Sequence, residues 1–295
     1  MLQRYLDPSI LASISGLELI AKTVVDGFIA GLHRSPDYGF SQEFAEYRAY
    51  SEGDDLRHVD WNVFARTERA YLKRYKGETN TFITLLLDVS ASMGYSSQAV
   101  SKIDYAKYLC ASLAYMASQQ RDASGIIVFD DEIRNYVPPS SRQGQFARML
   151  HAIESAKLGT RTKLSEPLLH CQQFIHRRGM IAMVSDFYEP VDDIMTAIQP
   201  LRAHGNELVL FHVLDPQEVQ PVLKDPVLIT DMETNEALEI SPEYVRNEYR
   251  HKIDAHVAEL ADKARAAGID YVFLNTARPL DEALREYMTV RHGKR

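Results

Sequence analysis

Short apolar runs alternate with longer amphipathic segments along the chain from residue 79 onward. The runs at residues 81–87, 124–129, 180–184 and 207–214 have the length and apolar character of buried strands. In the segments between them, apolar residues recur at three- and four-residue spacing, which is typical of helices. Strands that alternate with helices in this way form parallel sheets covered by helices on both faces. The sequence therefore predicts an α/β fold with a doubly wound, mainly parallel sheet.

The remaining elements follow from the same periodicity and from turn residues. We predict helices over residues 102–121, 142–156, 165–176, 191–203, 242–267 and 280–290. We predict further strands over residues 70–75, 132–137 and 271–274. The second of these is expected to be an edge strand, stopped by Pro138-Pro139. A β-hairpin is predicted over residues 227–240, with its turn near Thr234-Asn235.

The N-terminal segment has the pattern of an amphipathic helix. Asp7-Pro8 is a good helix start, and apolar residues then recur at helical spacing as far as Leu32, with a bend expected near Gly16. Such a helix packs on its own domain more often than on a partner. We therefore predict that residues 1–78 form a helical and Arg-rich extension packed on a main domain. That main domain covers residues 79–295 and includes a hairpin insertion at 222–241.

Residues 43–76 are dense in arginine and acidic residues and contain the only tryptophan of the chain. Interleaved guanidinium and carboxylate groups favour bidentate ion pairs, so one interpretation is a structural network that clamps this region to the main domain. The other interpretation is an Arg-rich face on which a partner docks. The candidate residues for either role are Arg48, Asp54, Asp55, Arg57, Asp60, Trp61 and Arg66.

The net charge and the cysteines indicate which ligands and which compartment to expect. The chain has 33 Lys and Arg against 41 Asp and Glu, a net charge of -8, which argues against nonspecific binding to nucleic acid or anionic membranes. Cys110 and Cys171 lie in helix-like apolar patterns without metal-ligand spacing, so buried, reduced thiols are expected. The N-terminus lacks a signal-peptide pattern, and no segment is long and uncharged enough to span a bilayer. We expect a cytoplasmic protein.

Polar side chains follow two of the predicted strands. Asp88, Ser90 and Ser92 come directly after the run at 81–87, and Asp186 comes after the run at 180–184. Because the carboxyl ends of parallel strands meet at one edge of a sheet, these oxygens are expected to lie close together, with Thr162 contributed by a further loop. Oxygen ligands without His or Cys suit a hard cation such as Mg²⁺, with Mn²⁺ or Ca²⁺ as alternatives. Neutral hydroxyls leave such an ion electrophilic, so a carboxylate from a partner protein would complete its shell.

A simpler interpretation applies to each of these loops. Asp88 can cap the following turn while Ser90 and Ser92 satisfy backbone groups. Asp130 and Asp131 also follow a predicted strand, and turn formation is the expected role for them.

The motifs resemble those of a known group of proteins. Asp88-x-Ser90-x-Ser92 on an apolar strand, Thr162 six residues before Leu168, and Val184-Ser185-Asp186 resemble the metal-ion-dependent adhesion site of von Willebrand factor A domains. Thr160 shares the loop of Thr162 and is the alternative ligand. The upstream residues are more specific, and they resemble the bacterial family known as domain of unknown function 58. They are Arg48-Ala49-Tyr50, Gly53-Asp54-Asp55, Arg57, Asp60-Trp61, Ala65-Arg66 and Glu78.

The resemblance covers residues from about 5 to 215 and implies both a fold and a partner. The fold is a von Willebrand factor A-like, Rossmann-type domain of three layers, with an N-terminal helix and strand extension. The implied partner is a MoxR-type AAA+ ATPase or its client, in the assembly or remodelling of protein complexes. Members anchored in membranes carry hydrophobic spans that this chain lacks, so the resemblance implies a soluble member.

Two other functions remain open from the residues alone. An Mg²⁺-dependent phosphotransferase or hydrolase could use Asp88, since strand-end aspartates also serve phosphoryl transfer. Against it, dehalogenase-type enzymes have a second acid where this chain has Ser90, and no phosphate-binding glycine loop occurs. The third function is a structural scaffold whose site binds no ion. The expected function is a non-enzymatic, metal-dependent protein-interaction module.

Overall fold

The chain divides into two compact units, one formed by residues 1–28 and 81–295 and the other by residues 29–80. The computed structural model describes residues 7–32, 44–49, 63, 71–75, 82–159, 164–203, 205–230 and 237–292. The N-terminal residues 1–28 therefore group with the main domain, whereas the prediction placed them with the Arg-rich extension. The reason is burial, since the apolar side chains of the helix in this segment are buried within the main unit.

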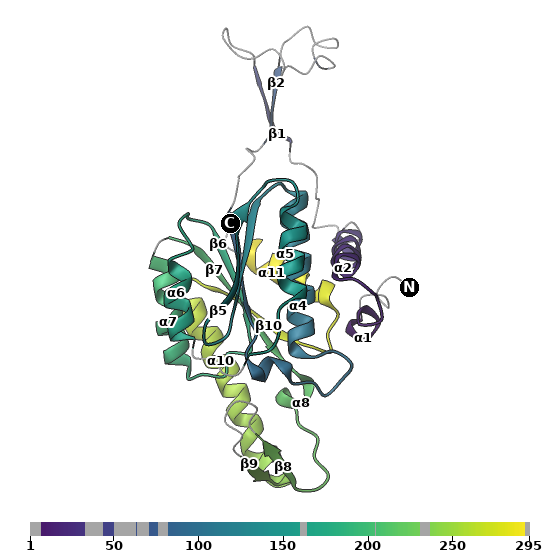
Figure 1. Cartoon of the computed structure of the whole chain (residues 1–295), viewed down its shortest axis with the longest axis vertical. Coiled ribbons are helices and arrows are strands. Elements are labelled where there is room, and N and C mark those ends of the chain that lie inside the picture. The colour runs from purple at the N-terminus through teal and green to yellow at the C-terminus, as the bar shows by residue number, and fades with distance from the viewer. Residues whose placement is uncertain are drawn as a thin grey trace. The chain divides into compact units, whose positions relative to one another are not determined.

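The larger unit is built on a six-stranded sheet with the strand order β10-β7-β6-β3-β4-β5 (Figure 1). All neighbouring strands are parallel except β4 and β5, which are antiparallel. The strands are β3 (Phe82–Asp88), β4 (Ala123–Phe129), β5 (Ile133–Ser140), β6 (Met180–Ser185), β7 (Glu207–Leu214) and β10 (Asp270–Asn275). The predicted α/β fold with a mainly parallel sheet is confirmed.

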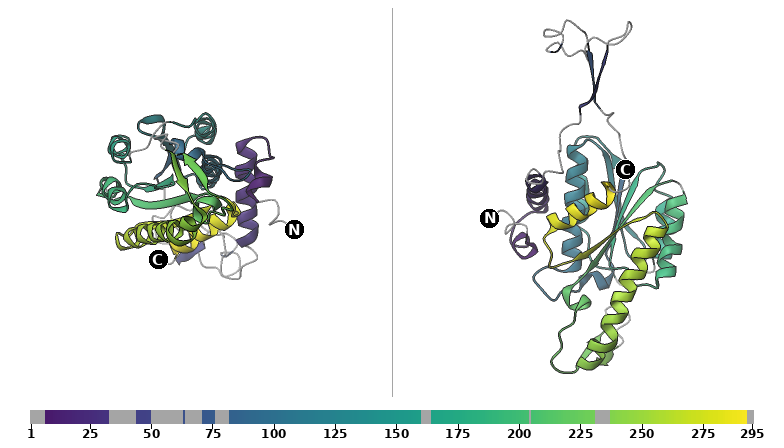
Figure 2. Two further views of the ribbon diagram at one scale, coloured as in Figure 1. Left: turned by 90° about the horizontal axis from the view of Figure 1, so that it is seen from below. Right: turned by 180° about the vertical axis from the view of Figure 1, so that it is seen from behind.

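Helices cover both faces of this sheet (Figure 2). On one face, α6, α7 and α10 share an apolar core with side chains of the central strands. On the other, α4 and α5 contact the strands, and Tyr287 of α11 packs against Phe211 of β7. The helices are α4 (Lys102–Gln119), α5 (Gln145–Glu154), α6 (Ser165–Gln172), α7 (Val191–Ala203), α10 (Arg250–Ala266) and α11 (Leu280–His292).

The position of β3 inside the sheet, between β6 and β4, explains why its sequence is apolar at successive positions. Leu85, Leu86 and Leu87 are all fully buried, because alternate side chains point to opposite faces and helices cover both. The strand ends at Asp88, where the chain passes into the 3₁₀ turn η3 (Ala91–Gly94).

The edge strand β5 runs further than the sequence predicts. It is an edge strand, as predicted, but it continues through Pro138 and Pro139 to Ser140. Prolines are tolerated there because an edge strand has one side without ladder hydrogen bonds. The register with β4 also shifts between Ser124 and Ile126, so the pairing is irregular opposite these prolines.

The N-terminal helix is broken where a bend was expected. α1 (Pro8–Leu11) starts at the N-cap Asp7, and α2 (Leu17–Leu32) follows after Gly16, whose φ of 99° is favourable only for glycine. Residues of α2 up to Phe28 bury an apolar face within the larger unit. This part of the helix packs on its own unit, as predicted.

The segment between β7 and α10 leaves the sheet and returns. It contains α8 (Pro216–Val219), the antiparallel pair β8 (Val227–Thr230) and β9 (Ala237–Ile240), and α9 (Pro242–Tyr244). A π-helical turn over Val245–Tyr249 then joins α9 to α10, so the predicted helix over 242–267 is continuous but irregular. The paired strands confirm the predicted hairpin, and its turn residues Thr234-Asn235 lie outside the described residues.

The second unit contains one described element pair, β1 (Phe44–Ala49) and β2 (Tyr71–Tyr75), which are antiparallel. β2 matches the predicted strand at 70–75, and β1 was not predicted. Of the candidate docking or ion-pair residues, Arg48 lies on β1 opposite Leu72. The others lie outside the described residues: Asp54, Asp55, Arg57, Asp60, Trp61 and Arg66. Within the described ranges of the whole chain, the structure contains no helix that is both long and apolar enough for a membrane span.

Candidate metal centre

Three neighbouring strands of the sheet end in acidic residues at the same edge. β3 ends at Asp88, β6 is followed by Asp186, and β7 is followed by Asp215. The strand order β7-β6-β3 places these three ends side by side. The parallel sheet therefore brings together residues that are far apart in the chain, as the sequence predicted for Asp88 and Asp186.

Asp88 is held by the polar residues around it. Its Oδ1 accepts a hydrogen bond from the Ser90 backbone N–H at 2.8 Å, and its Oδ2 accepts one from Ser185 Oγ at 2.6 Å. The hydroxyls of Ser90 and Ser92 lie 3.1 Å apart. Asp88 and Ser90 are almost completely buried. The predicted motif of Asp88, Ser90 and Ser92 is thus one connected group of oxygens, and Asp88 also accepts the turn hydrogen bond of the simpler interpretation.

The two aspartates of the site repel each other. Burial and, after it, the nearby charge of Asp186 raise the pKa of Asp88 to about 7, although hydrogen bonds from Ser185 and Ser90 lower it. A buried carboxylate next to another carboxylate is stabilised in its ionised form by a cation. A positive charge at this edge would therefore stabilise the ionised form of Asp88.

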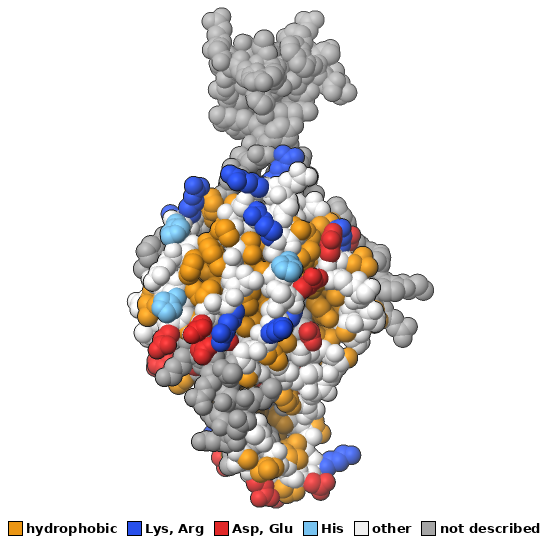
Figure 3. Space-filling view, in the orientation of Figure 1, with side chains coloured by type: hydrophobic (Ala, Val, Ile, Leu, Met, Phe, Trp, Pro, Cys, Tyr) orange, Lys and Arg blue, Asp and Glu red, His pale blue; other side chains and the backbone are white. Residues whose placement is uncertain are grey.

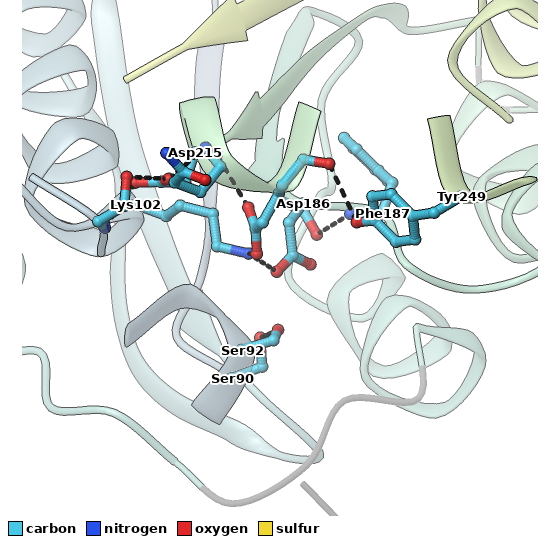
Figure 4. Close-up of polar contacts among 11 residues, drawn as sticks. Ser90, Ser92, Lys102, Asp186, Phe187, Asp215 and Tyr249 are labelled. Atoms are coloured by element: carbon cyan, nitrogen blue, oxygen red, sulfur yellow. Dashed lines mark hydrogen bonds and ion pairs between the residues drawn. The ribbon is translucent and has the colours of Figure 1, made fainter. Parts of the chain in front are cut away.

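Lys102 lies in the same cluster and was not predicted as a site residue (Figure 4). Its Nζ is 2.8 Å from Asp186 Oδ2 and 2.6 Å from Glu218 Oε1 of α8, and it lies 4.7 Å from the centre of the Tyr188 ring. The side chain is 0% exposed. Burial alone would lower the pKa of Lys102, but the two carboxylates together raise it above its ordinary value. Lys102 is therefore a buried ammonium ion.

One local signal pointed to Lys102. It occupies the first position of α4, directly after the N-cap Ser101. A positive charge at the N-terminus of a helix opposes the helix dipole, so a lysine at this position indicates a specific acidic partner. Glu218 has a signal too, since Asp215-Pro216-Gln217-Glu218 is a capping box at the start of α8.

The capping box joins two loops at this edge. Asp215 accepts hydrogen bonds from the backbone N–H of Ser97, at 2.9 Å, and from its hydroxyl, and it also accepts from the Gln217 N–H. Glu218 Oε2 in turn accepts from the Asp215 N–H at 2.8 Å. The loop after η3 and the start of α8 are thus fixed to each other through Asp215.

Thr162 and its alternative Thr160 lie outside the described residues, but both flanks of their loop are described. On one side, the Gly159 N–H donates to the carbonyl oxygen of Val89 at 2.7 Å, one residue after Asp88. On the other, the Leu164 N–H donates to Glu189 Oε1 at 2.6 Å, three residues after Asp186. The loop that carries both threonines therefore begins and ends beside the two strand ends.

Asp130 and Asp131 have the turn-forming role that the sequence predicted. Asp130 accepts from the Glu132 N–H at 3.0 Å, and both acids pair with Arg134. They therefore belong to the β4–β5 turn.

The residues present suit a hard cation. In the described part of the chain, no group of three or more His, Cys, Asp or Glu is arranged to hold a metal. The predicted set instead has two carboxylates and otherwise neutral hydroxyls, which fits an ion that keeps several of its waters. One oxygen of Asp186 is engaged by Lys102, so its Oδ1 is the atom left for an ion or for its water.

Four exposed arginines lie at the opposite edge of the sheet. Arg121, Arg142, Arg177 and Arg178 are exposed and precede β4, α5 and β6, so they lie at the amino-terminal side of the sheet. On the face drawn in Figure 3, several Lys and Arg side chains gather near the upper end. A cation at the carboxyl edge is therefore not opposed by these arginines, because the strands separate the two edges.

Sequence comparison places this arrangement in a family. A model of the family described as "Protein of unknown function DUF58" matches residues 46–259, which is more than half of the chain. The chain belongs to this family. The matched range includes Asp88, Ser90, Ser92, Lys102, Asp186 and Glu218.

Relatives of similar length occur in mycobacteria. The uncharacterized protein Rv1480 of Mycobacterium tuberculosis is 29% identical over 278 residues, which cover 92% of this chain and 86% of the relative. The uncharacterized protein Mb1516 of Mycobacterium bovis gives the same values.

Two solved structures that match part of this chain come from Bacteroides. The conserved hypothetical protein BatB from Bacteroides thetaiotaomicron is 17% identical with a TM-score of 0.45, and the match covers 72% of this chain and 99% of that one. An aerotolerance-related membrane protein from Bacteroides fragilis is 16% identical with a TM-score of 0.49, covering 70% and 97%.

Proposed function

We propose that the chain is a non-enzymatic, metal-dependent protein-interaction module. The observation that carries the proposal is the connected oxygen group of Asp88, Ser90 and Ser92, with Asp186 at the end of the neighbouring strand. Burial and the neighbouring charge of Asp186 raise the pKa of Asp88, and a cation beside Asp88 would offset both effects. The arrangement resembles a von Willebrand factor A domain with its adhesion site.

In this proposal Asp88, Ser90, Ser92 and Asp186 hold Mg²⁺ directly or through its waters, and Thr162 or Thr160 completes the protein ligands. Mn²⁺ and Ca²⁺ are alternatives of the same ligand preference. Because the hydroxyls are neutral, the bound ion keeps affinity for one more anionic ligand. That ligand is a carboxylate of a partner protein.

The partner we propose is a MoxR-type AAA+ ATPase or its client, with the module acting as an adaptor or co-chaperone in the cytoplasm. Membership of the DUF58 family supports this through the resemblance described above. The two free, buried cysteines, Cys110 and Cys171, suit a reducing compartment.

Ion binding by the purified protein tests the metal part of the proposal. We expect Mn²⁺ to bind with one site per chain in a calorimetric titration, and the double variant S90A/S92A to bind at least tenfold more weakly. The matched control is Ser96→Ala, which removes an exposed hydroxyl from the same loop and should bind as wild type does. Equal affinity in wild type and S90A/S92A would exclude this site.

Partner binding is tested with a purified MoxR-type ATPase from the source organism. We expect wild type to bind it in Mg²⁺ and to lose binding in chelator, and Asp186→Ala to bind weakly in both conditions. Binding that is unchanged by the chelator and by Asp186→Ala would contradict an interface completed by a metal ion. Phosphate-ester hydrolysis that Asp88→Asn abolishes would favour the phosphotransferase or hydrolase alternative instead.

A further inference from the structure

We propose that Lys102 is a resident positive charge that weakens divalent-ion binding at the Asp88 and Asp186 site. The inference rests on the proposed function and concerns the regulation of that same site. Lys102 would act as a positioning residue, because it holds one oxygen of Asp186 and contributes a charge of the same sign as the ion. A carboxylate from the partner would then be needed for tight ion binding.

The first support is the geometry of the Asp186 carboxylate. Lys102 Nζ lies 2.8 Å from Oδ2, a distance typical of a charge-assisted hydrogen bond. An ion that binds Asp186 must share this carboxylate with the ammonium group or displace it. Either outcome reduces the affinity that two unshared carboxylates would give.

The second support is that Lys102 is fixed in place. Its side chain is fully buried, and its second carboxylate partner, Glu218, is itself held by the Asp215 N–H. Asp215 is tied to Ser97, and the Tyr188 ring covers the ammonium group. A lysine with contacts on α8, on Asp186 after β6 and on an aromatic ring cannot swing into solvent without breaking several of them.

A purely structural ion pair is the competing explanation, since breaking a buried pair is destabilising whatever its function. The two explanations differ in what they predict for the ion. A structural pair affects stability and leaves the ion affinity of the folded protein unchanged. A resident charge raises the affinity when the lysine is removed and lowers it when the lysine loses its second carboxylate.

The experiment measures Mn²⁺ affinity by calorimetry in wild type, Lys102→Met and Glu218→Gln, with folding checked by circular dichroism. We expect Lys102→Met to bind Mn²⁺ at least tenfold more tightly and Glu218→Gln to bind it at least threefold more weakly. The matched control is Lys107→Met, which removes a charge from the same helix where the lysine donates only to the Ala156 carbonyl oxygen. That variant should stay within twofold of wild type.

Each outcome decides between the explanations. Tighter binding by Lys102→Met, including binding that appears only in that variant, supports the resident charge. Wild-type affinity in the folded Lys102→Met and Glu218→Gln variants overturns it and leaves the metal site intact. Absence of Mn²⁺ binding in every variant overturns both the inference and the proposed metal site. If Lys102→Met does not fold, Glu218→Gln decides alone, and an unchanged or tighter affinity there contradicts the inference.

Discussion

At the scale of the residue, His212 of β7 is an imidazole kept neutral by its surroundings. Its Nδ1 is 2.7 Å from the Tyr271 hydroxyl, and the side chain is completely buried. The rings of Phe187 and Phe273 pack against it in T-shaped arrangements. Burial and, after it, the neighbouring His256 lower the pKa of His212 to about 3, although the Asp186 backbone raises it.

This depressed pKa predicts a loss of stability in acid. The unfolded chain takes up a proton on His212 below its ordinary pKa of about 6.5, and the folded chain does not until about 3. The free energy of unfolding should therefore be unaffected by His212 above pH 6.5. As pH falls from about 6.5 towards 3, it should decrease by about 1.4 kcal/mol per pH unit.

Urea unfolding at several pH values between 7.5 and 4.5 measures this slope. Other groups titrate in the same range, so the test is the difference between wild type and His212→Gln. The difference in the free energy of unfolding between wild type and His212→Gln should change with pH below 6.5. The control His151→Gln replaces an exposed histidine, and its free energy of unfolding should differ from that of wild type by the same amount at every pH. Parallel curves for wild type and His212→Gln would contradict the assignment.

Residues of the candidate site were predictable where their signal is local. Asp88, Ser90 and Ser92 follow one apolar run, and Asp186 follows another, so strand-end position was enough to group them. Lys102 and Glu218 are 116 positions apart, and their pairing depends on how α4 and α8 meet. The helix-dipole signal marks Lys102 as unusual, but only the tertiary structure identifies its partners.

At the scale of the element, the pairing of β4 with β5 depends on Gly125. A Cβ at this position would lie 2.5 Å from the Val137 carbonyl oxygen and 2.6 Å from the Pro139 nitrogen. Both are backbone atoms, so no side-chain rotation relieves the clash. The edge strand can therefore approach β4 this closely only because residue 125 has no side chain.

Gly125→Ala is predicted to destabilise the protein by roughly 2–4 kcal/mol, because β5 must move away from β4. The measurement is the free energy of unfolding from urea titration. Gly144→Ala is the comparison, since a Cβ there meets nothing within 4 Å and the φ of 83° alone costs about 1–2 kcal/mol. A smaller loss for Gly125→Ala than for Gly144→Ala would show that β5 adapts without cost.

The elements differ in how well sequence alone locates them. The prediction for β7 matches at both ends, because its apolar run is bounded by polar residues and by a glycine turn. β5 was predicted to stop at its prolines and does not, because an edge position tolerates them. β1 was missed because its sequence, Phe44 to Ala49, mixes charged with apolar residues.

At the scale of the whole molecule, the larger unit is made from two separate stretches of chain. Residues 1–28 belong with residues 81–295, and Leu17, Ile20, Val24 and Phe28 are buried. The helix is thus part of the hydrophobic core of that unit. Residues 29–80 form a unit of their own.

This division predicts which part of the chain can be removed. Replacing residues 29–80 by a Gly/Ser linker of about 20 residues, with a root-mean-square span of about 25 Å, should leave the larger unit cooperatively folded. Deleting residues 1–80 should lower its unfolding temperature, because it uncovers the apolar surface beneath α2. Differential scanning calorimetry of the two variants checks both. Equal unfolding temperatures would mean that α2 does not stabilise this unit.

The fold class was predictable from the sequence and the strand order was not. Alternating strands and helices indicate a parallel sheet wherever they occur, since the helical crossovers require it. The order β10-β7-β6-β3-β4-β5 places β3, the first strand of the sheet in the chain, in the interior between β6 and β4. That order depends on how the helices between the strands pack on the two faces of the sheet. No local pattern in the sequence of β3 specifies which strands are its neighbours.

The order of the strands also determines when, during synthesis, the contacts at the carboxyl edge of the sheet can form. Asp88 leaves the ribosome long before its hydrogen-bond partner Ser185, which is 97 positions later in the chain. Lys102 and its partner Glu218 are separated by 116 positions. Chains are made from the N-terminus, and parallel strands pair only after the intervening crossover has been translated. A nascent chain therefore contains Asp88, Ser90 and Ser92 first. It gains Ser185 and Asp186 later, and Glu218, the second partner of Lys102, last. The carboxyl edge of the sheet therefore has its full set of contacts only after the chain has been made past Glu218.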